Sequence, residues 1–445
     1  MSIPEEYSNR HAYHFTHINN ISDMISDGLL ANNHPDFPKD KVLSVAQAQI
    51  QERRAGMNVS CAPHGVVHDY VPLYFCSVCP MLLAVIKKKN IEQEDIVYLE
   101  FPISILSDYP SVFTDASANT NINPTFYSDP KDLVRLPWAA IDDRKWGSDL
   151  GDGYINKRMC ELLVKDSLPL DAANRIVVWN ANNKKLIEEM AADKNITIPP
   201  VVIGDCYERT HYYKDYNHHK YNSSSPGPKE TLKELNNAII SIQNRTIPNS
   251  PKFATIDELL SALRKSLAAT PYTGELIGLN SANGVHKKTV DKHTIDVVNN
   301  LLSSSGYREL TPRCKVIVEL AAYLHDIGKG PKSRWNFSKG LQLVDDRHPI
   351  KALSMVVCIL NDYVQTVDTW EGDCLVKLIC YHDFIGDVLG KGRNKEQLVT
   401  FINTADELKM LFALCRADTR SLSVNWWDDI KAGLLYTEMK AICGL

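Results

Sequence analysis

A stretch rich in serine, proline and glycine, HHKYNSSSPGPKE at residues 218–230, divides the chain into two halves with different patterns. Before it, β-type runs such as DIVYLEFPI and RIVVWNA alternate with helical runs such as KLIEEMAAD. After it, nearly every segment has helical periodicity. Because such a composition favours a linker, we predict an α/β (α+β) domain over residues 1–213, a linker with short helices over 214–284, and an all-α domain over 285–445.

The composition is that of an ordinary globular protein, with 44% hydrophobic and 23% charged residues. The net charge of -5 gives no overall basic signal for nucleic acid, although a local basic groove would not change that average. The sequence contains no apolar run of about 18 residues and no signal-peptide core, so we predict a cytoplasmic protein without membrane contact. The eleven cysteines fit free thiols. Cys76 and Cys79 have a zinc-type spacing, but no second pair accompanies them.

Metal-type side chains recur on the apolar faces of the predicted C-terminal helices. In VIVELAAYLHDIGKG, His325 lies at helical spacing from Val318, and Gly328 is predicted to end the helix. Inward faces or helix starts also carry His293, Asp326, His348, His382 and Asp418. Each alone is more readily explained as a hydrogen-bonded core residue. Burying all six in one bundle is unfavourable unless they compensate each other, and a metal ion is the usual compensation.

The order His, His-Asp, His, His, Asp, together with HDIGKG at residues 325–330, resembles the HD superfamily of metal-dependent phosphohydrolases over about residues 285–425. The resemblance implies an HD-type helical domain with one or two divalent ions, of Mn, Fe, Mg, Co or Ni. A first ion would be held by His293, His325, Asp326 and Asp418, and a second by Asp326, His348 and His382. The resemblance also implies that Lys329 faces a substrate phosphate during hydrolysis at phosphorus.

The N-terminal half contains polar residues whose roles the spacing alone leaves open. YHFTHINN places His14 and His17 in a β-type run, as polar residues at a strand end, as metal ligands or as contacts to a ligand in a cleft. IQERRAG puts Arg53 and Arg54 at the end of a helical run, which fits a solvated helix end equally well. YINKRMCELLV puts Glu161 just before a β-like run, where an exposed strand residue is an equal reading.

The order of YHFTHI, IQERR, HDYVPLYF with PML, FTD and K-x-x-x-E-L-L-V resembles the DarT family of DNA ADP-ribosyltransferases across about residues 10–213. The resemblance implies an ADP-ribosyltransferase-like fold, NAD as co-substrate, and modification of a base in single-stranded DNA, with thymidine favoured. His14 would contact the NAD ribose, and Glu161 would stabilise an oxocarbenium-like ribose. The implied cofactor-binding residues are His14, Thr16, Asn20 and Arg54, and the implied catalytic residues are Arg54 and Glu161.

Two departures from the family pattern bear on the target. CSVC precedes PML where the family commonly has a Pro-Arg-Ser type run, and LGDGYINKR before Glu161 is glycine-rich where relatives are often more helical. Tyr70, Tyr74 and Phe75 are candidates for stacking on a nucleobase, although VPLYF is more simply explained as core.

Three hypotheses follow for the whole chain. In the first, a DarT-like transferase is fused to an HD phosphohydrolase and acts as a toxin, in a toxin–antitoxin or phage-defence system; the HD domain would restrain, reverse or add to the transferase. In the second, the ADP-ribose acceptor is a protein, an RNA or a nucleotide. In the third, the chain is a nucleic-acid-binding module with an inactive HD scaffold. Single-stranded DNA is the predicted partner, an antitoxin protein is a second one under the first hypothesis, and the sequence predicts no oligomeric state.

Overall fold

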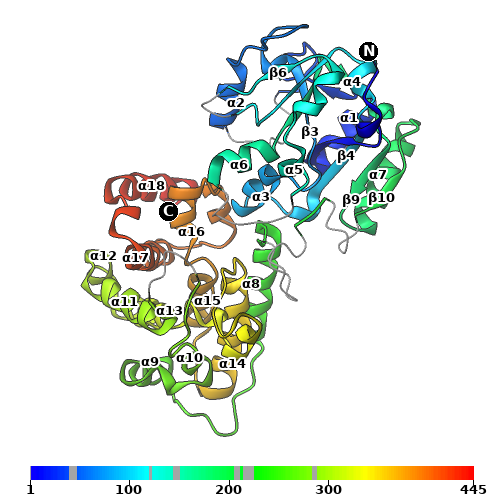
Figure 1. Cartoon of the computed structure of the whole chain (residues 1–445). Coiled ribbons are helices and arrows are strands. Elements are labelled where there is room, and N and C mark those ends of the chain that lie inside the picture. The colour runs from blue at the N-terminus through cyan, green and yellow to red at the C-terminus, as the bar shows by residue number, and fades with distance from the viewer. Residues whose placement is uncertain are drawn as a thin grey trace. The chain divides into compact units, whose positions relative to one another are not determined.

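A computed structural model describes residues 2–39, 48–119, 123–143, 151–204, 211–213, 225–282 and 288–445, without the side chains of residues 48–50 and 152. The chain separates into two compact units. The first comprises Met1–Lys87 and Ile91–Ser224, and the second comprises Lys88–Asn90 and Ser225–Leu445. The first unit is built on a β-sheet and the second is helical (Figure 1), as the two sequence patterns predict.

An eight-stranded sheet forms the first unit, in the order β10-β9-β4-β1-β3-β7-β5-β6. Neighbouring strands are antiparallel except for the parallel pair β9 and β10. Two further short strands, β2 and β8, pair with each other. The strands are β1 His11–His17, β2 Leu29–Leu30, β3 Tyr70–Tyr74, β4 Ile96–Pro102, β5 Ser111–Thr114, β6 Phe126–Tyr127, β7 Glu161–Lys165, β8 Ser167–Leu168, β9 Arg175–Val178 and β10 Val201–Ile203.

The centre of this sheet follows from the most continuous apolar run. The predicted strand DIVYLEFPI is β4, and six of its seven residues are buried. A strand buried on both faces needs apolar residues at successive positions rather than in alternation. Beside β4, the strands β1, β3 and β7 are adjacent, with Tyr13 opposite Tyr74 and Tyr74 opposite Glu161. Three segments far apart in the sequence therefore meet at one place in the sheet.

Short helices surround the sheet, and their ends follow local rules. Helix α1 ends at Gly28, which has φ 73°, and a Cβ there would lie 2.8 Å from the Leu168 carbonyl oxygen, so glycine is required. The segment before Glu161 contains a helix, α6, so the predicted non-helical approach is wrong where it is described; residues 144–150 lie outside the described part. The helices are α1 Ile21–Asp27, α2 Ala48–Ala55, α3 Pro80–Lys87, α4 Ile105–Asp108, α5 Trp138–Ile141, α6 Gly151–Arg158 and α7 Ala181–Asp193.

The second unit begins at Ser225, within the segment predicted as a linker. Helices α8 and α9 contribute Leu235, Leu259 and Leu260 to the same hydrophobic core as the later helices. Thr255 caps α9, since its hydroxyl accepts the Glu258 N–H. The helices are α8 Pro228–Gln243, α9 Ile256–Lys265, α10 Pro271–Gly274, α11 Val290–Ser303, α12 Ser305–Arg308, α13 Pro312–Leu324, α14 His348–Tyr363, α15 Thr369–Cys380, α16 Phe384–Lys391, α17 Ala405–Leu422 and α18 Asp429–Ile442.

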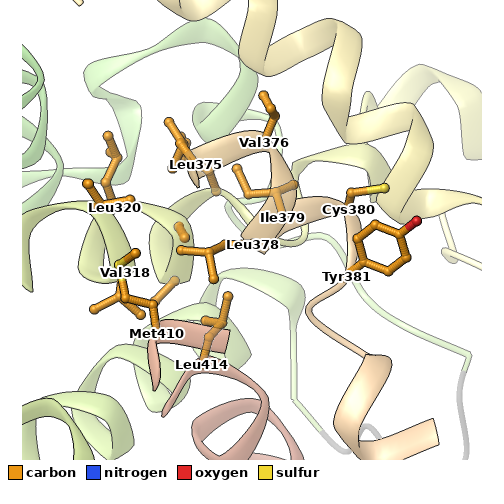
Figure 2. Close-up of a cluster of buried hydrophobic side chains, with 14 of the residues drawn as sticks. Val318, Leu320, Leu375, Val376, Leu378, Ile379, Cys380, Tyr381, Met410 and Leu414 are labelled. Atoms are coloured by element: carbon orange, nitrogen blue, oxygen red, sulfur yellow. The ribbon is translucent and has the colours of Figure 1, made fainter. Parts of the chain in front are cut away.

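Helix α15 runs through the core of the helical unit. Figure 2 shows α15 residues such as Leu375, Leu378 and Ile379 among side chains of α13, such as Val318 and Leu320, and of α17, such as Met410 and Leu414. The α15 residues Leu378 and Ile379 are almost fully buried. This packing fixes the position of the end of α15 and therefore of His382, two residues beyond it.

Gly328 does not end a helix as predicted, because α13 already ends at Leu324. Gly328 lies instead in a short 3-10 helix, η9 Ile327–Lys329, packed against the start of α14. A Cβ at residue 328 would lie 2.0 Å from the His348 carbonyl oxygen and 2.7 Å from the Ala352 nitrogen. Only glycine allows this close approach, which brings the His325–Asp326 pair next to His348.

In the part of the chain that the structure describes, no helix combines the length and the apolar character needed to cross a membrane.

Candidate functional sites

His14 lies on β1 with its side chain held by the neighbouring strand. Its Nδ1 is 2.9 Å from the Pro72 carbonyl oxygen, which can only accept, so Nδ1 carries the proton and Nε2 is the acceptor of the neutral ring. Burial lowers the pKa of His14 and outweighs the hydrogen bond to Pro72. In the 3-10 helix that follows β1, the Asn20 amide donates to the hydroxyl of Thr16 on β1 at 2.9 Å, and both side chains are buried.

Arg54 and Glu161 form a buried ion pair. Nη1 of Arg54 is 3.0 Å from Oε1 and 2.9 Å from Oε2 of Glu161. Arg54 is 7% exposed and Glu161 is fully buried, whereas the adjacent Arg53 is exposed. Burial lowers the pKa of Arg54, but the charges of Glu161 and Tyr74 and the hydrogen bond to Glu161 together outweigh burial, so the net pKa is raised. The helix-end arginines predicted from the sequence therefore have different environments.

The segment after β5 holds the Glu161 carboxylate. The Ala118 N–H donates to Oε1 at 2.8 Å, and the Ser117 hydroxyl lies 3.4 Å from the same oxygen. The Glu161 N–H donates to the Thr114 hydroxyl at 3.1 Å. The sequence singled out the FTD motif but not these donors, because nothing in the spacing indicates that the chain turns back over β7.

Tyr74 of β3 lies between strand β1, which carries His14, and strand β7, which carries Glu161. It faces Tyr13 of β1 and Glu161 of β7 across the strands, and its ring stacks on Phe15 at 5.9 Å. Burial, and next the Glu161 charge, raise the pKa of Tyr74 well above its ordinary value. Phe75 instead packs against Phe113 and Trp138 in the core, so of the predicted stacking residues only Tyr70 and Tyr74 line the cavity.

A cavity of about 210 Å³ lies beside these residues in the sheet unit. Its lining includes the four residues predicted to bind NAD, namely His14, Thr16, Asn20 and Arg54. Glu161 is not part of the lining, because it sits behind Arg54. The lining also contains residues that the sequence analysis did not single out, such as Gln51 and His68. These two side chains hydrogen-bond each other at 3.0 Å.

His17 is not among the residues that line the cavity. Its Nδ1 accepts the Asn19 N–H at 3.2 Å, and its Nε2 is 3.6 Å from Asp95. This arrangement caps the short 3-10 helix after β1. Of the two histidines in YHFTHI, His14 therefore lines the cavity, whereas His17 has a structural contact.

The sheet unit is similar in sequence to proteins of a known family. The family model described as "ssDNA thymidine ADP-ribosyltransferase, DarT" matches residues 13–213. A DNA ADP-ribosyl transferase of Thermus sp. (strain 2.9) is 33% identical over 173 residues, which cover 38% of this chain and 80% of the relative. The chain belongs to the DarT family. A second DarT relative, the DNA ADP-ribosyl transferase of Thermus aquaticus, is 31% identical over 208 residues, which cover 45% of this chain and 88% of the relative.

Two solved structures of Thermus sp. 2.9 DarT also align with the chain. The complex with ADP-ribosylated ssDNA has a TM-score of 0.41 and 29% identity, over 48% of this chain and 99% of the other. The complex with NAD+ has a TM-score of 0.40 and 26% identity, over 47% of this chain and 100% of the other. The family model and the two Thermus relatives confirm the DarT resemblance that the sequence motifs predict, and their matches concern the sheet unit.

The helical unit brings together all six metal-type residues that the sequence singled out. His293 comes from α11, His325 and Asp326 follow α13, His348 begins α14, His382 follows α15, and Asp418 lies on α17. Their donor atoms form two groups, each with all atoms within 4.8 Å of one another: His293, His325 and Asp418, and Asp326, His348 and His382. Cys76 and Cys79 occur in neither group, and both are buried free thiols.

Each histidine of the cluster is anchored through Nδ1, which leaves Nε2 directed at the cluster. Nδ1 donates to the Ala322, Asp345 and Ile379 carbonyl oxygens in the case of His325, His348 and His382, at 2.7–2.8 Å. The fourth anchor is Ser421, whose hydroxyl donates to the Asp418 carbonyl at 2.6 Å and accepts from His293 Nδ1 at 3.0 Å. Such outer contacts fix the tautomer in which Nε2 has a free lone pair for a cation.

Asp326 belongs to the second group and also contacts the histidines of the first. Its Oδ2 is 3.5 Å from Nε2 of both His293 and His325, and its Oδ1 is 3.3 Å from Nε2 of His348. Burial lowers the pKa of His325, but Asp326 and then Asp418 raise it to about 9, so the carboxylates strongly favour positive charge here. Lys329 Nζ lies 2.6 Å from Asp326 Oδ2, so this lysine contacts the cluster itself.

Proposed function

We propose that the sheet unit transfers ADP-ribose from NAD to a base in single-stranded DNA, with thymidine favoured. The observation that carries the proposal is the Arg54–Glu161 ion pair at the edge of the cavity, in a chain of the DarT family. Both Thermus relatives are DNA ADP-ribosyl transferases, which supports the acceptor class. The described cavity lining supplies both neutral polar groups for a ribose and a cation for a diphosphate.

In this proposal the neutral ring of His14 hydrogen-bonds the nicotinamide ribose, and Thr16 and Asn20 line the same end of the cavity. The bond from nicotinamide nitrogen to ribose carbon breaks, and a bond from that carbon to a base nitrogen forms. Positive charge develops on the ribose, and the Glu161 carboxylate stabilises it. The same carboxylate accepts the proton that the base nitrogen loses.

The position of Glu161 behind Arg54 adds a step to this scheme. Arg54 occupies the side of the carboxylate that faces the cavity. A diphosphate is a better partner for the guanidinium than one carboxylate, because it offers more charge and a matching geometry. Binding of NAD would therefore draw Arg54 away from Glu161, while Ala118 and Ser117 keep the carboxylate in place.

The test is incubation of the full chain with NAD and a mixed-sequence single-stranded oligonucleotide, read by mass spectrometry. The Glu161→Gln variant keeps the shape of the side chain and removes its charge. An ADP-ribose mass gain in the wild type that is absent in the variant would support the proposal. Label from NAD on protein, RNA or free nucleotide but not on DNA would overturn the acceptor assignment.

For the helical unit we propose metal-dependent hydrolysis of a phosphate ester. The specific observation is that the two oxygens of Asp326 face different histidines, which fits a carboxylate bridging two ions. The donor set of imidazole nitrogens and carboxylates suits Mn, Fe, Co, Ni or Mg. His293, His325, Asp326 and Asp418 would hold one ion, and Asp326, His348 and His382 a second. Such ions supply Lewis acidity and orient a phosphoryl group.

Residues near this cluster would bind the anionic substrate. Lys329 is only 8% exposed and contacts Asp326. It would therefore neutralise a phosphoryl oxygen only once that oxygen is bound inside the site, next to Asp326. A test is hydrolysis of bis-p-nitrophenyl phosphate with added Mn²⁺, comparing wild type with His325→Ala. Equal rates in both proteins would contradict the proposal.

We further propose that the chain acts as a toxin in bacterial conflict and that the helical unit restrains the DarT unit. A DNA-modifying transferase without restraint would harm its own host. On this proposal, expression of the His325→Ala, Asp326→Ala double variant is more toxic than expression of the wild type. Unchanged or lower toxicity at equal protein level would count against restraint.

A further inference from the structure

Asp383 stands at the N-cap of α16, directly after His382. Aspartate is preferred at N-caps because its carboxylate accepts N–H groups of the first turn. Two other N-cap aspartates of the helical unit, Asp368 and Asp428, each accept two such groups. Asp383 makes no capping bond, and its backbone angles of φ -83° and ψ -11° are helical rather than extended. The sequence position therefore suggests a cap that the side chain does not form.

One oxygen of the Asp383 carboxylate faces the histidine cluster instead, and the other lies 3.9 Å from Lys89 Nζ. Oδ1 of Asp383 lies 3.6 Å from Nε2 of His382. The donor atoms of Asp383, His382 and Asp418 all lie within 4.8 Å of one another, which makes a third metal-type group among the described residues. This group shares one member with each of the other two, so Asp383 belongs to the same cluster.

The spacing of donors around His382 fits a shared ion. Donors at the usual metal distance of about 2.1 Å lie about 3.0–3.5 Å apart when adjacent in octahedral or tetrahedral geometry. Nε2 of His382 is 3.1 Å from Nε2 of His348, and Nε2 of His348 is 3.3 Å from Oδ1 of Asp326. The contact of 3.6 Å between His382 and Asp383 lies just above this range.

We propose that Asp383 is the fourth protein ligand of the second ion position, beside Asp326, His348 and His382. The inference rests on the metal centre proposed above and goes beyond its six residues. Each position then has two histidines and two carboxylates, with Asp326 shared. The first position has these donors in His293, His325, Asp326 and Asp418, whereas the second without Asp383 has only three.

Exposure adds a consequence for substrate access. The Asp383 side chain is 30% exposed, whereas those of His348 and Asp418 are 12% and 10% exposed and those of His293, His325 and Asp326 are at most 5% exposed. Asp383 therefore marks the solvent-facing side of the cluster. The second ion position is the one that a phosphoryl group from solution reaches first.

The experiment measures Mn²⁺ binding to the full chain by equilibrium dialysis with elemental analysis, and by electron paramagnetic resonance. The variants are Asp383→Asn, which keeps the size of the side chain, and Asp383→Ala, which removes the donor. Asp428→Asn is the matched control, because it removes an N-cap charge in the same unit away from the cluster. Circular dichroism checks that each variant is folded.

We expect two Mn²⁺ ions per wild-type and Asp428→Asn chain, with a spin-coupled signal. Both Asp383 variants should retain the first ion, bind the second at least about tenfold more weakly, and lose the coupled signal. Two ions bound with unchanged affinity in both Asp383 variants would overturn the role of Asp383 and leave the metal centre intact. Fewer than two ions in the wild type would overturn the two-ion centre and this inference with it.

Discussion

Nη1 of Arg54 lies 2.9 Å from Oε2 of Glu161, and both side chains are buried beside a cavity. A buried ion pair is weak evidence for stability, because desolvation offsets much of the attraction. A pair that a charged substrate can separate is better explained by function. Arg54 lines the cavity and contacts Glu161, so in the proposed function a diphosphate that draws Arg54 away would open the Glu161 carboxylate to the cavity.

Replacing Arg54 by lysine should reduce transfer to DNA by about 100-fold, because lysine lacks the planar guanidinium fork that would bind the NAD diphosphate. The measurement is kcat/KM for NAD with a single-stranded oligonucleotide. Arg53→Lys is the matched control, since Arg53 is adjacent and exposed, and it should retain near wild-type activity. Equal losses in both variants would show that the basic helix end, and not the Arg54–Glu161 pair, matters.

Replacing Gly328 by alanine should destabilise the helical unit by about 1–3 kcal/mol or more, because the added methyl group meets the backbone of α14 at 2.0 Å. Gly433→Ala in α18 is the control: an added Cβ there meets nothing within 4 Å, and alanine favours a helix by about 1 kcal/mol. Urea unfolding compares the two. A Gly328→Ala chain as stable as the wild type would refute the close approach.

Removing the Ser421 hydroxyl should weaken Mn²⁺ binding at the first ion position by about 10–100-fold, because His293 loses the acceptor that fixes its tautomer. Equilibrium dialysis measures the effect on the Ser421→Ala variant. Ser303→Ala removes a hydroxyl with a similar bond to a backbone carbonyl, outside the cluster, and should bind as the wild type does. Identical affinities for all three proteins would argue against the anchoring role.

Glu100 should make the sheet unit sensitive to acid. Burial alone would raise the pKa of Glu100, but hydrogen bonds from His211 and Arg175 lower it to about 2. The stabilisation is complete above the unfolded pKa of about 4.5, on the order of 3 kcal/mol, and is lost as the pH falls toward 2. The difference in unfolding free energy between wild type and Glu100→Gln should shrink over that window. A difference independent of pH would contradict this assignment.

Much of the fold follows from local patterns. The continuous apolar run of β4, the Thr255 cap and the helical second half were all predictable, because burial and capping leave short-range signals. The segment before Glu161 was predicted wrongly because its glycines suggested a loop, whereas Gly151–Arg158 forms α6. Local propensity is a weak guide where tertiary packing decides.

The candidate sites were predictable only in part. Residues in sequence motifs, such as Arg54 and His325, were found because their types and order are distinctive. Gly328 was identified but misinterpreted, since its close contact with α14 depends on packing between helices. Asp383 was missed because an aspartate before a helix is ordinarily interpreted as an N-cap. Only the three-dimensional structure shows that its carboxylate makes no capping bond and lies near His382 instead.

The most direct test of the central claim is the mass of a single-stranded oligonucleotide after incubation with NAD and either the wild-type chain or Glu161→Gln. We predict a gain of one ADP-ribose with the wild type, located on thymidine by fragmentation, and no gain with the variant. An oligonucleotide left unmodified by a folded wild-type chain, or modified equally by Glu161→Gln, would contradict the account.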